Sequence, residues 1–297
     1  MTADFIPVKA IPGQDWVMLA IGQRYDVVFT ANQTAGNYWF RAEVAGDCLS
    51  ANNGKGRALF TYSTVTVDDT ITDANTAAPG GCSELVTVPY WKQAVDSSTF
   101  AAQVKTLDTG VGPGVTANGQ NLVLWHLNTT SMTIHWEDPT LQYVFDGNTS
   151  YPAAADIIEI PTEGVWTYWV IQIAPNMPPP PHPIHLHGHD FFVLGSGTGT
   201  FDASTSTSSL NFATPPRRDT SVLPGGGWLV IAFPANNPGS WLLHCHIAWH
   251  IGEGLGVQFL EAKSSITMPD KTQFDSQCAA WKAYMPKMAY PQIDSGL

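Results

Sequence analysis

The chain carries little charge, and very little of it is basic. Lys and Arg number 13 against 25 Asp and Glu, and charged residues make up 13% of the sequence, so the formal net charge is −12. Nucleic acid and anionic membrane surfaces repel such a protein, because the electrostatic contribution to binding is unfavourable. The sequence therefore predicts no nucleic-acid partner and no membrane partner, and it favours a soluble protein that works in acidic surroundings.

Long hydrophobic runs are missing, and cysteines are few. No segment approaches the roughly 18 consecutive apolar residues that a membrane-spanning helix requires. Residues 1–10, MTADFIPVKA, have neither the basic start nor the apolar stretch of a secretion signal, and taken alone they favour the cytoplasm. With 297 residues, the chain is too long to be a small scaffold held by disulfides alone.

Glycine and proline, by contrast, are abundant, at 26 and 22 residues. Together with 44% hydrophobic residues they favour a turn-rich protein of short strands over a helical bundle or a coiled coil. Segments rich in Val, Phe, Tyr and Trp recur between breaks of Asn and Gly, and we expect them to be strands. They cover residues 17–22, 24–30, 37–44, 57–63, 121–128, 133–137, 156–160 and 165–173. Only the tail, from about 270 to 285, is typical of a helix, so the predicted fold class is all-β.

The four cysteines and three glycosylation sequons bear on the compartment. In an extracellular chain, Cys48 and Cys82 can close a loop across the Gly/Asn-rich stretch between them. Cys245 lies between two histidines, which indicates metal chemistry instead, and Cys278 is left without a partner. The sequons indicate secretion, whereas residues 1–10 taken alone favour the cytoplasm. They place candidate glycans on Asn32, Asn128 and Asn148.

Histidine is concentrated in two short segments. Of nine histidines none precedes residue 126, and seven lie in HPIHLHGH and HCHIAWH. The first segment holds His182, His185, His187 and His189, and the second holds His244, His246 and His250 around Cys245. Imidazole and thiolate at this density are ligands for copper or zinc.

Strand geometry divides these ligands into two sets. Successive side chains of a strand point to opposite faces, so Cys245 faces one way while His244 and His246 face the other. In the first segment His185 and His187 share one parity and His182 has the other. His250 follows Cys245 by five residues and can fold back to it. One site then holds His182, Cys245 and His250, the ligand set of a blue-copper centre, with Leu255 expected at the weak axial position.

At this point the sequence resembles a known family. HPIHLHGHDF and WLLHCHIAWHIGEGLGVQFLE are similar to the third and fourth copper signatures of multicopper oxidases, and most similar to those of ascomycete-type fungal laccases. GQRYDVV, PPRRDT and the ending IDSGL support the resemblance. It implies cupredoxin-like Greek-key β-sandwich or barrel domains.

The resemblance also assigns copper ligands. It implies a type 1 copper at His182, Cys245 and His250, with Leu255 as a non-coordinating axial neighbour. It implies that His185 serves a type 2 copper. The type 3 copper pair would then be bound by His187, His244 and His246.

The implied activity is that of a laccase. Phenols and aromatic amines are oxidised one electron at a time, and O2 is reduced by four electrons to water. The resemblance places Trp249 and Trp125 at the substrate pocket and makes Cys245, with its neighbours His244 and His246, the path between the copper sites. It implies a secreted, glycosylated monomer of the kind that takes part in lignin degradation.

Departures from the family define the expected domains. An oxygen-reducing cluster of this family needs eight histidines, and this sequence matches four of them. Residues 1–66 resemble the second half of a middle cupredoxin domain, 67–111 a linker, and 112–297 the carboxyl-terminal cupredoxin domain with the copper sites. We therefore expect a fragment that is inactive alone, in which type 2 and type 3 coppers need the missing amino-terminal part. Cys278 matches a cysteine whose partner lies there.

Two other functions remain open. The chain as given can act as a type 1 copper-binding electron-transfer module without oxygen reduction. Alternatively, it belongs to another multicopper oxidase, such as an ascorbate oxidase or a ferroxidase. Leu255 and the DSGL ending favour the laccase.

Overall fold

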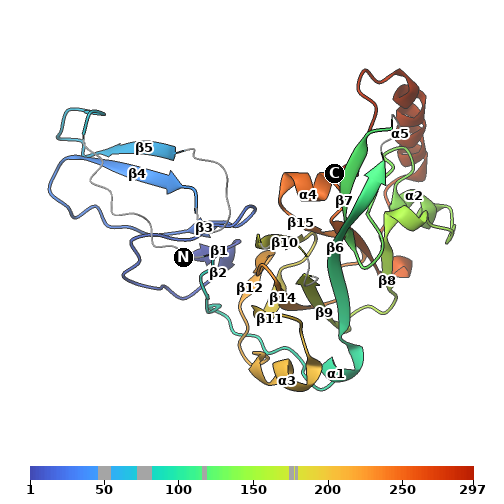
Figure 1. Ribbon diagram of the computed structural model, residues 1–297, viewed down its shortest axis with the longest axis horizontal. Helices are drawn as coiled ribbons and strands as arrows, with labels where there is room; N and C mark the ends of the chain where they lie inside the picture. Colours follow the sequence, from blue (N-terminus) through green and yellow to red (C-terminus); the bar gives the residue numbers. More distant parts are fainter. Residues whose placement is uncertain (46–54, 72–81, 116–118, 174–176, 178–179) are drawn as a thin grey trace.

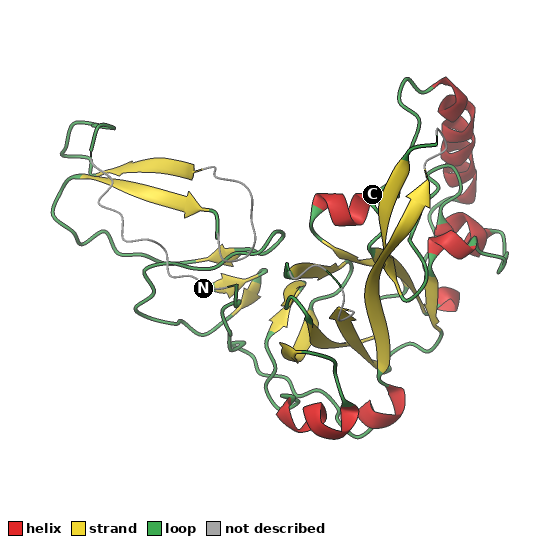
Figure 2. Ribbon diagram, viewed as in Figure 1, coloured by secondary structure: helices red, strands yellow, loops and turns green. Residues whose placement is uncertain are grey.

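Strands account for most of the regular secondary structure in the computed structural model of the protein. The structure describes residues 1–45, 55–71, 82–115, 119–173, 177 and 180–297. The carboxyl-terminal part consists of two facing sheets, drawn at the right of Figure 1, and the amino-terminal strands lie to one side of them. Figure 2 shows that helices occur mainly at the edges of these sheets. The all-β expectation is confirmed.

The larger sheet has the strand order β12-β11-β14-β9-β6-β7. All its pairs are antiparallel except β6 with β9. The central strand β14 reads GWLVIAFP and is buried along almost its whole length, as a strand covered on both faces requires. The strands are β12 (Arg217–Arg218), β11 (Phe191–Thr198), β14 (Gly227–Pro234), β9 (Trp166–Ile173), β6 (Lys105–Val115) and β7 (Asn121–Leu127).

The smaller sheet has the order β13-β10-β15-β16-β8 and carries the two histidine segments on adjacent strands. β10 and β15 are antiparallel, and their register places Ile184 opposite Cys245 and His185 opposite His244. β16 pairs with β8 in parallel. The strands are β13 (Thr220–Leu223), β10 (His182–Leu186), β15 (Gly239–Cys245), β16 (Gly256–Glu261) and β8 (Ile157–Ile160).

The main core lies between these two sheets. Trp169 of β9 packs on Phe259 of β16 with ring centroids 4.6 Å apart, and Phe233 packs on the same ring at 5.6 Å. Cys245 belongs to this core and is completely buried. Because burying one large apolar side chain contributes about 1.5–3 kcal/mol, this cluster fixes the positions of β10 and β15.

A second core covers the outer face of the larger sheet. Val95 and Phe100 pack there against Tyr168 and Phe192. Residues 67–111 were expected to form a linker, but Lys105–Val115 form strand β6 of the larger sheet, and Val95 and Phe100 pack in the second core. The Gly-rich strand KTLDTGVGPG has the composition of a turn, which explains the difference. The division of the chain into domains stays a prediction.

The amino-terminal part contains two small sheets. One has the order β2-β1-β3 and the other is the pair of β4 with β5. Figure 1 shows β1 to β3 next to the carboxyl-terminal sheets and β4 and β5 farther away. The strands are β1 (Thr2–Ala3), β2 (Ile6–Pro7), β3 (Tyr25–Asp26), β4 (Asn37–Glu43) and β5 (Lys55–Thr61).

Helices are short except for the one near the carboxyl end. They are α1 (Phe100–Gln103), α2 (Thr140–Phe145), α3 (Ala203–Ser206), α4 (Ala248–Gly252) and α5 (Lys271–Tyr284). Single 3-10 turns are η2 (Ala153–Ala155), η3 (Thr207–Ser209), η4 (Lys263–Ser265) and η5 (Met285–Lys287). The side chain of Asp270 caps α5 by accepting from the Gln273 amide. Within the described ranges, no helix has both the length and the apolar character needed to cross a bilayer.

Three expected strands differ from the structure. Residues 17–22 form no strand, and only Tyr25–Asp26 of residues 24–30 pair. Residues 133–137 form no strand: Trp136 and Glu137 lie in a turn, the Ile134 amide donates to the Ser295 carbonyl, and the Trp136 indole donates to the Gly296 carbonyl. Strands require hydrogen-bonding partners that local composition does not specify.

The cysteines differ in state. Cys82 is disulfide-bonded, whereas Cys48 lies outside the described residues, so the proposed Cys48–Cys82 pairing stays a prediction. Cys245 and Cys278 have free thiols.

Candidate metal centres

Three side chains from separate elements converge beneath the smaller sheet to form the first cluster. The Cys245 Sγ lies 3.7 Å from Nδ1 of His182 and 3.5 Å from Nδ1 of His250, and the two nitrogens are 3.1 Å apart. His182 and Cys245 are completely buried, and His250 is partly exposed. A cluster of two nitrogens and one sulfur within bonding reach of a single point can hold one metal ion.

Local backbone structure brings His250 back to Cys245. β15 ends at Cys245, and α4 then reverses the chain so that His250 faces the sulfur. The next segment closes the loop: the Leu255 amide donates to the His250 carbonyl, and the Cys245 amide donates to the Leu255 carbonyl. The Leu255 side chain is 1% exposed and belongs to the main core. An apolar residue therefore closes this side of the cluster.

Burial sets the protonation state of the first cluster. It lowers the pKa of His182 to about 3 and that of His250 to about 4, because a buried imidazolium is poorly solvated. Burial also raises the pKa of the Cys245 thiol to about 12. Both imidazoles are neutral at pH 7, so their lone pairs are available, and the sulfur becomes a thiolate when a cation replaces its proton. These donors fit copper, and they do not fit the oxygen-preferring ions Mg²⁺ and Ca²⁺.

The second cluster lies on the opposite face of the same strand. His185, His187 and His244 have ring nitrogens close enough to share a metal ion, and the Nε2 atoms of His187 and His244 are 3.1 Å apart. Burial lowers the pKa of His244 to about 4 and also lowers the pKa of His187. His246 lies next to this cluster, with its ring centroid 5.7 Å from that of His185.

Hydrogen bonds fix two of these rings. Nδ1 of His185 lies 2.7 Å from the Asp219 carbonyl oxygen and 3.0 Å from the Thr220 hydroxyl, so Nδ1–H donates to the carbonyl and Nε2 is left for a metal. Nδ1 of His244 lies 2.9 Å from the Cys245 carbonyl, which has the same effect. Such contacts to the far nitrogen are typical of metal-binding histidines.

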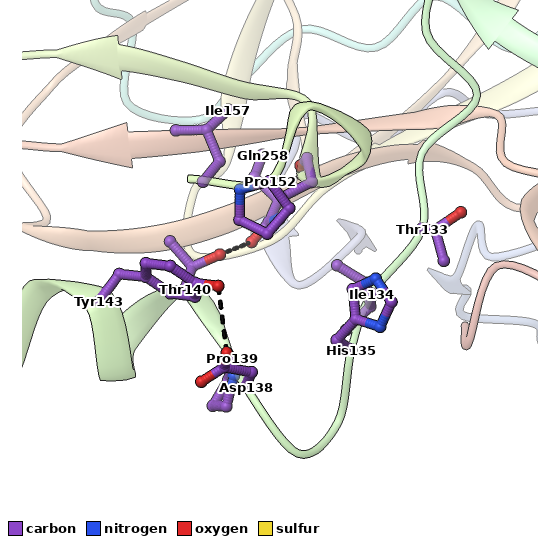
Figure 3. Close-up of a pocket in the computed structure, with 11 residues that line it drawn as sticks. Thr133, Ile134, His135, Asp138, Pro139, Thr140, Tyr143, Pro152, Ile157 and Gln258 are labelled. Carbon is purple, nitrogen blue, oxygen red and sulfur yellow. Dashed lines mark hydrogen bonds between the residues drawn. The ribbon is translucent and has the colours of Figure 1, made fainter. Parts of the chain in front are cut away.

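His189 and His135 lie apart from both clusters. His189 Nε2 is 2.8 Å from Glu261 Oε2, and both side chains are almost fully buried. His135 lines a separate cavity of about 70 Å³ beside α2. Figure 3 shows this cavity, with Tyr143 donating to Asp138 and Thr140 donating to Gln258. Its lining contains no residue of either cluster.

The predicted pocket residues have different exposures. Trp249 is 80% exposed beside His250. Trp125 is 5% exposed and stacks on the His250 ring, so it supports the cluster from inside. Their roles in substrate binding stay predictions. The three sequon asparagines Asn32, Asn128 and Asn148 are all exposed.

The fold and both clusters can now be compared with known proteins. Two family models, both described as multicopper oxidase, match residues 122–265 and residues 1–65. Together these matches contain both histidine segments and the amino-terminal strands. The chain belongs to the multicopper oxidase family.

Relatives of this multicopper oxidase include laccases. Laccase-3 of Botryotinia fuckeliana is 46% identical over 273 residues, covering 87% of this chain and 58% of that protein. Laccase-2 of Podospora anserina is 38% identical and covers 100% of this chain and 50% of that protein. The crystal structure of laccase from Botrytis aclada has a TM-score of 0.84 at 36% identity, covering 99% of this chain and 53% of that one. The chain spans about half the length of the curated relatives it matches.

These comparisons confirm the expected family and fold. The sheets of this multicopper oxidase match laccase structures, as the cupredoxin-like expectation requires. Copper is the metal that the family implies. The structure brings together the residues expected at the first cluster, and it places His246 beside the second cluster. Sequence reasoning missed the contacts of Asp219 and Thr220 with His185, of Gly22 with His246, and of Arg24 with Asp219, although these four residues lie in the motifs GQRYDVV and PPRRDT.

Proposed function

We propose that the chain is part of a laccase-type multicopper oxidase and carries its type 1 copper site. The reaction is the one-electron oxidation of phenols and aromatic amines, coupled to the four-electron reduction of O2 to water. The observation that carries this proposal is the buried cluster of His182, Cys245 and His250, back to back with a second histidine cluster across one strand.

Each residue of the first cluster has a defined task. His182, Cys245 and His250 would hold the type 1 copper, which supplies single-electron acceptance and release. Leu255 lies beside them and has no electron pair to donate, so it cannot stabilise the cupric state. We therefore expect a high reduction potential.

The second cluster would hold the oxygen-reducing coppers. In this proposal His185 serves the type 2 copper, and His187, His244 and His246 serve the type 3 pair. Peptide bonds join Cys245 directly to His244 and His246, so one short backbone segment connects the two clusters. His187 is exposed and His185, His244 and His246 are partly exposed, which leaves this cluster open to further ligands.

A reducing substrate would approach at His250. The His250 ring is partly exposed, and the exposed Trp249 indole offers a flat apolar surface for an aromatic ring. Trp125 packs behind His250 and holds it in place. The net charge of −12 and the three exposed sequons support a secreted glycoprotein without nucleic-acid or membrane partners, and we expect it to be a monomer.

Copper loading of the purified chain tests the proposal. We expect the blue absorption of a thiolate–copper bond without sustained phenol-dependent O2 uptake. The reason is that His185, His187, His244 and His246 are only half of the eight histidines that the oxygen-reducing cluster needs. Four-electron O2 uptake by this chain alone would contradict the expected inactivity. No blue absorption at any copper concentration would contradict the type 1 assignment.

The alternative is an electron-transfer module that keeps the type 1 site only. The second cluster together with His246 has four histidines, half of the eight that oxygen reduction needs, and this favours the module as a description of the isolated polypeptide. Sequencing the DNA upstream of the Met1 codon distinguishes the two functions. Two further His-x-His signatures in frame would support the laccase, and a stop codon with a promoter would support the module. Another multicopper oxidase, such as an ascorbate oxidase, is tested by comparing ascorbate with phenols as electron donors to the blue site.

A further inference from the structure

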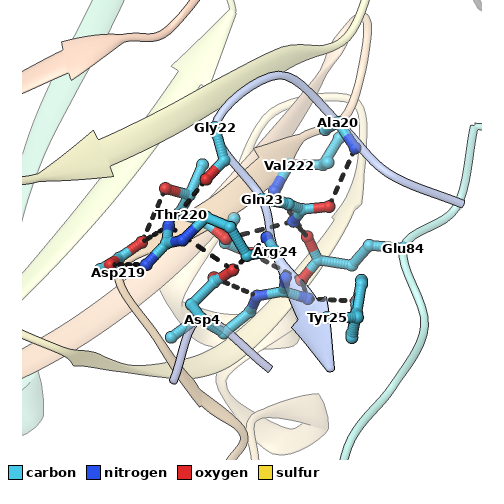
Figure 4. Close-up of polar contacts among 12 residues, drawn as sticks. Asp4, Ala20, Gly22, Gln23, Arg24, Tyr25, Glu84, Asp219, Thr220 and Val222 are labelled. Atoms are coloured by element: carbon cyan, nitrogen blue, oxygen red, sulfur yellow. Dashed lines mark hydrogen bonds and ion pairs between the residues drawn. The ribbon is translucent and has the colours of Figure 1, made fainter. Parts of the chain in front are cut away.

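We propose that the turn Gly22–Arg24, together with Asp219 and Thr220, is a positioning element that holds His185 and His246 in orientation for metal binding. The inference rests on the proposed function, because it assumes that these histidines bind copper. It adds residues from the amino-terminal part of the chain to the second cluster. Figure 4 shows Arg24 reaching across to Asp219, with Thr220 beside them.

The first contact joins the turn to the loop behind His185. The Arg24 guanidinium donates to both oxygens of the Asp219 carboxylate, with Nη1···Oδ1 at 2.7 Å and Nη2···Oδ2 at 2.5 Å. Two parallel hydrogen bonds fix direction as well as distance. Nη1 of Arg24 also donates to the Gly22 carbonyl at 2.7 Å, so the guanidinium locks its own turn.

The second contact transmits this order to the His185 ring. The Thr220 hydroxyl donates to Oδ1 of Asp219 at 2.8 Å and lies 3.0 Å from Nδ1 of His185. The Asp219 carbonyl accepts from the same Nδ1 at 2.7 Å. Because Arg24 holds the Asp219 carboxylate, the main-chain carbonyl of Asp219 is also fixed in position. His185 is thereby kept with its proton on Nδ1 and with Nε2 toward the cluster.

The third contact is steric and acts on His246. Gly22 has φ +87°, and a Cβ added to it would lie 2.5 Å from Cδ2 and 2.9 Å from Cγ of the His246 ring. The bare backbone of the turn therefore lies directly against the imidazole. A side chain at this position would strain the backbone and displace the ring.

The turn is anchored well enough to act as a support. The Arg24 amide donates to Oδ1 of Asp4, and Oδ2 of Asp4 accepts from Nε of the fully buried Arg218. Gln23, which is 7% exposed, donates to Glu84 at 2.7 Å and to the Thr220 carbonyl at 3.1 Å. The positioning contacts thus belong to a connected network, so that the guanidinium is held even though about a third of the Arg24 side chain is exposed.

A turn that only joined the amino-terminal strands to the carboxyl-terminal sheets would make the same contacts. The test therefore compares copper binding at the two clusters within one molecule. Arg24→Gln removes the two hydrogen bonds to the Asp219 carboxylate. Arg24→Lys keeps the positive charge but cannot form two parallel hydrogen bonds. Thr220→Val removes only the hydroxyl and leaves the ion pair in place. Arg217→Gln is the matched control, because Arg217, on β12, pairs with Asp190 and belongs to neither cluster.

Copper affinity of each cluster is measured in the full chain by competition with a chelator. The blue absorption reports the first cluster. The non-blue cupric EPR signal reports a single copper ion at the second cluster, whose three converging histidines can hold one ion without the complete type 2 and type 3 set. We expect the dissociation constant of the non-blue site to rise about 10–100-fold in Arg24→Gln and Thr220→Val, which is the usual effect of removing a group that orients a metal ligand. It should rise less in Arg24→Lys and stay unchanged in Arg217→Gln, while the blue site keeps its affinity in all four.

Unchanged affinity of the non-blue site in both Arg24→Gln and Thr220→Val would overturn the proposal. So would a parallel loss at both clusters together with a lower unfolding temperature, which is the signature of an interface role alone.

A measurement without metal separates this proposal from the proposed function. Long-range ¹H–¹⁵N NMR of the metal-free chain reports the His185 tautomer. We expect the Nδ1–H form in the wild type and a mixture of tautomers in Arg24→Gln, in which the Asp219 carbonyl is no longer held in place. The same tautomer mixture in the wild type would overturn the positioning role, even in a chain that binds copper. A fixed wild-type tautomer in a chain that binds no copper would instead refute the proposed function.

Discussion

The indole of Trp125 lies against the imidazole of His250, with ring centroids 4.2 Å apart and planes inclined by 36°. The same indole meets His182 edge-on at 5.0 Å. Nε2 of His182 is buried and has no hydrogen-bond partner among the described residues, so on that side packing holds the ring. The Trp125 amide donates to the Glu253 carbonyl, which ties β7 to the residue after α4. One tryptophan therefore supports both histidines of the first cluster.

Truncating this tryptophan should weaken the cluster and the fold together. Trp125→Ala is expected to lower the free energy of unfolding by about 3–5 kcal/mol, because it leaves a large cavity. It should also broaden the blue absorption of the copper-loaded chain, since His182 and His250 gain freedom. Urea unfolding and visible spectra measure the two effects. Trp249→Ala is the control, because Trp249 is 80% exposed, and it should leave stability within about 0.5 kcal/mol of the wild type. Equal stability of Trp125→Ala and Trp249→Ala would contradict the supporting role.

Replacing the thiol of the first cluster should abolish the blue colour. In Cys245→Ser the thiolate that causes the charge-transfer band is gone, while His182 and His250 remain to bind copper. The visible spectrum after copper loading measures this. Cys278→Ser removes the other free thiol, which lies on α5 away from both clusters, and should keep the colour. A blue band that persists in Cys245→Ser would refute the ligand assignment.

Asp156 should make stability depend on pH. Burial raises the pKa of this carboxyl to about 6, so the folded chain binds its proton more tightly than the unfolded chain does. Ionised Asp156 therefore opposes folding above pH 6, and this cost disappears as the pH falls below the ordinary pKa near 4.

The variant Asp156→Asn tests this directly. We expect it to stabilise the chain at pH 7 by about 1 kcal/mol, a value reduced for partial solvent screening, and to have no effect below about pH 4. Asn also tolerates the left-handed backbone of this position, where φ is 44°. Thermal unfolding of both proteins across this pH range measures the difference. A stabilisation that grows as the pH falls would contradict the assigned direction.

The buried pair of His189 and Glu261 should be structural. Glu261 accepts from the Asn237 amide at 2.6 Å and lies 2.8 Å from His189 Nε2, so its removal leaves two buried groups without partners. Each such group costs about 1–3 kcal/mol, so Glu261→Ala should be clearly destabilised in urea, with the blue absorption retained. The control is Glu159→Ala, which loses a half-exposed pair with Lys263 and should change stability by under about 1 kcal/mol. Loss of the blue band in a folded Glu261→Ala protein would assign the pair a role at the metal site.

Much of the first cluster could be predicted from the sequence, because strand alternation is a local rule. Cys245 and His244 are adjacent on β15, and the two-residue period alone places them in different clusters. His250 follows Cys245 by five residues, and helix α4, which contains His250, turns the chain back toward the Cys245 sulfur.

The support of the second cluster could not be predicted in the same way. Arg24 and Asp219 are 195 residues apart in sequence, and no periodicity links them. Residues 24–30 were expected to form a strand, but only Tyr25–Asp26 pair, and Gly22 in the preceding turn lies against His246. Likewise residues 133–137 have the composition of a strand, yet Ile134 and Trp136 are bonded to the carboxyl-terminal residues. Tertiary packing decides which hydrogen-bonding partners such a segment finds, and a single sequence does not specify that packing.

The central claim is that His182, Cys245 and His250 hold one copper ion, separately from the histidines across β15. Titration of the full chain with copper, followed at once by visible absorption and EPR, tests it most directly. We expect an intense blue band that saturates at one copper per chain, and a separate non-blue cupric signal from the second cluster. A single non-blue signal at every copper concentration, with no blue band, would contradict it.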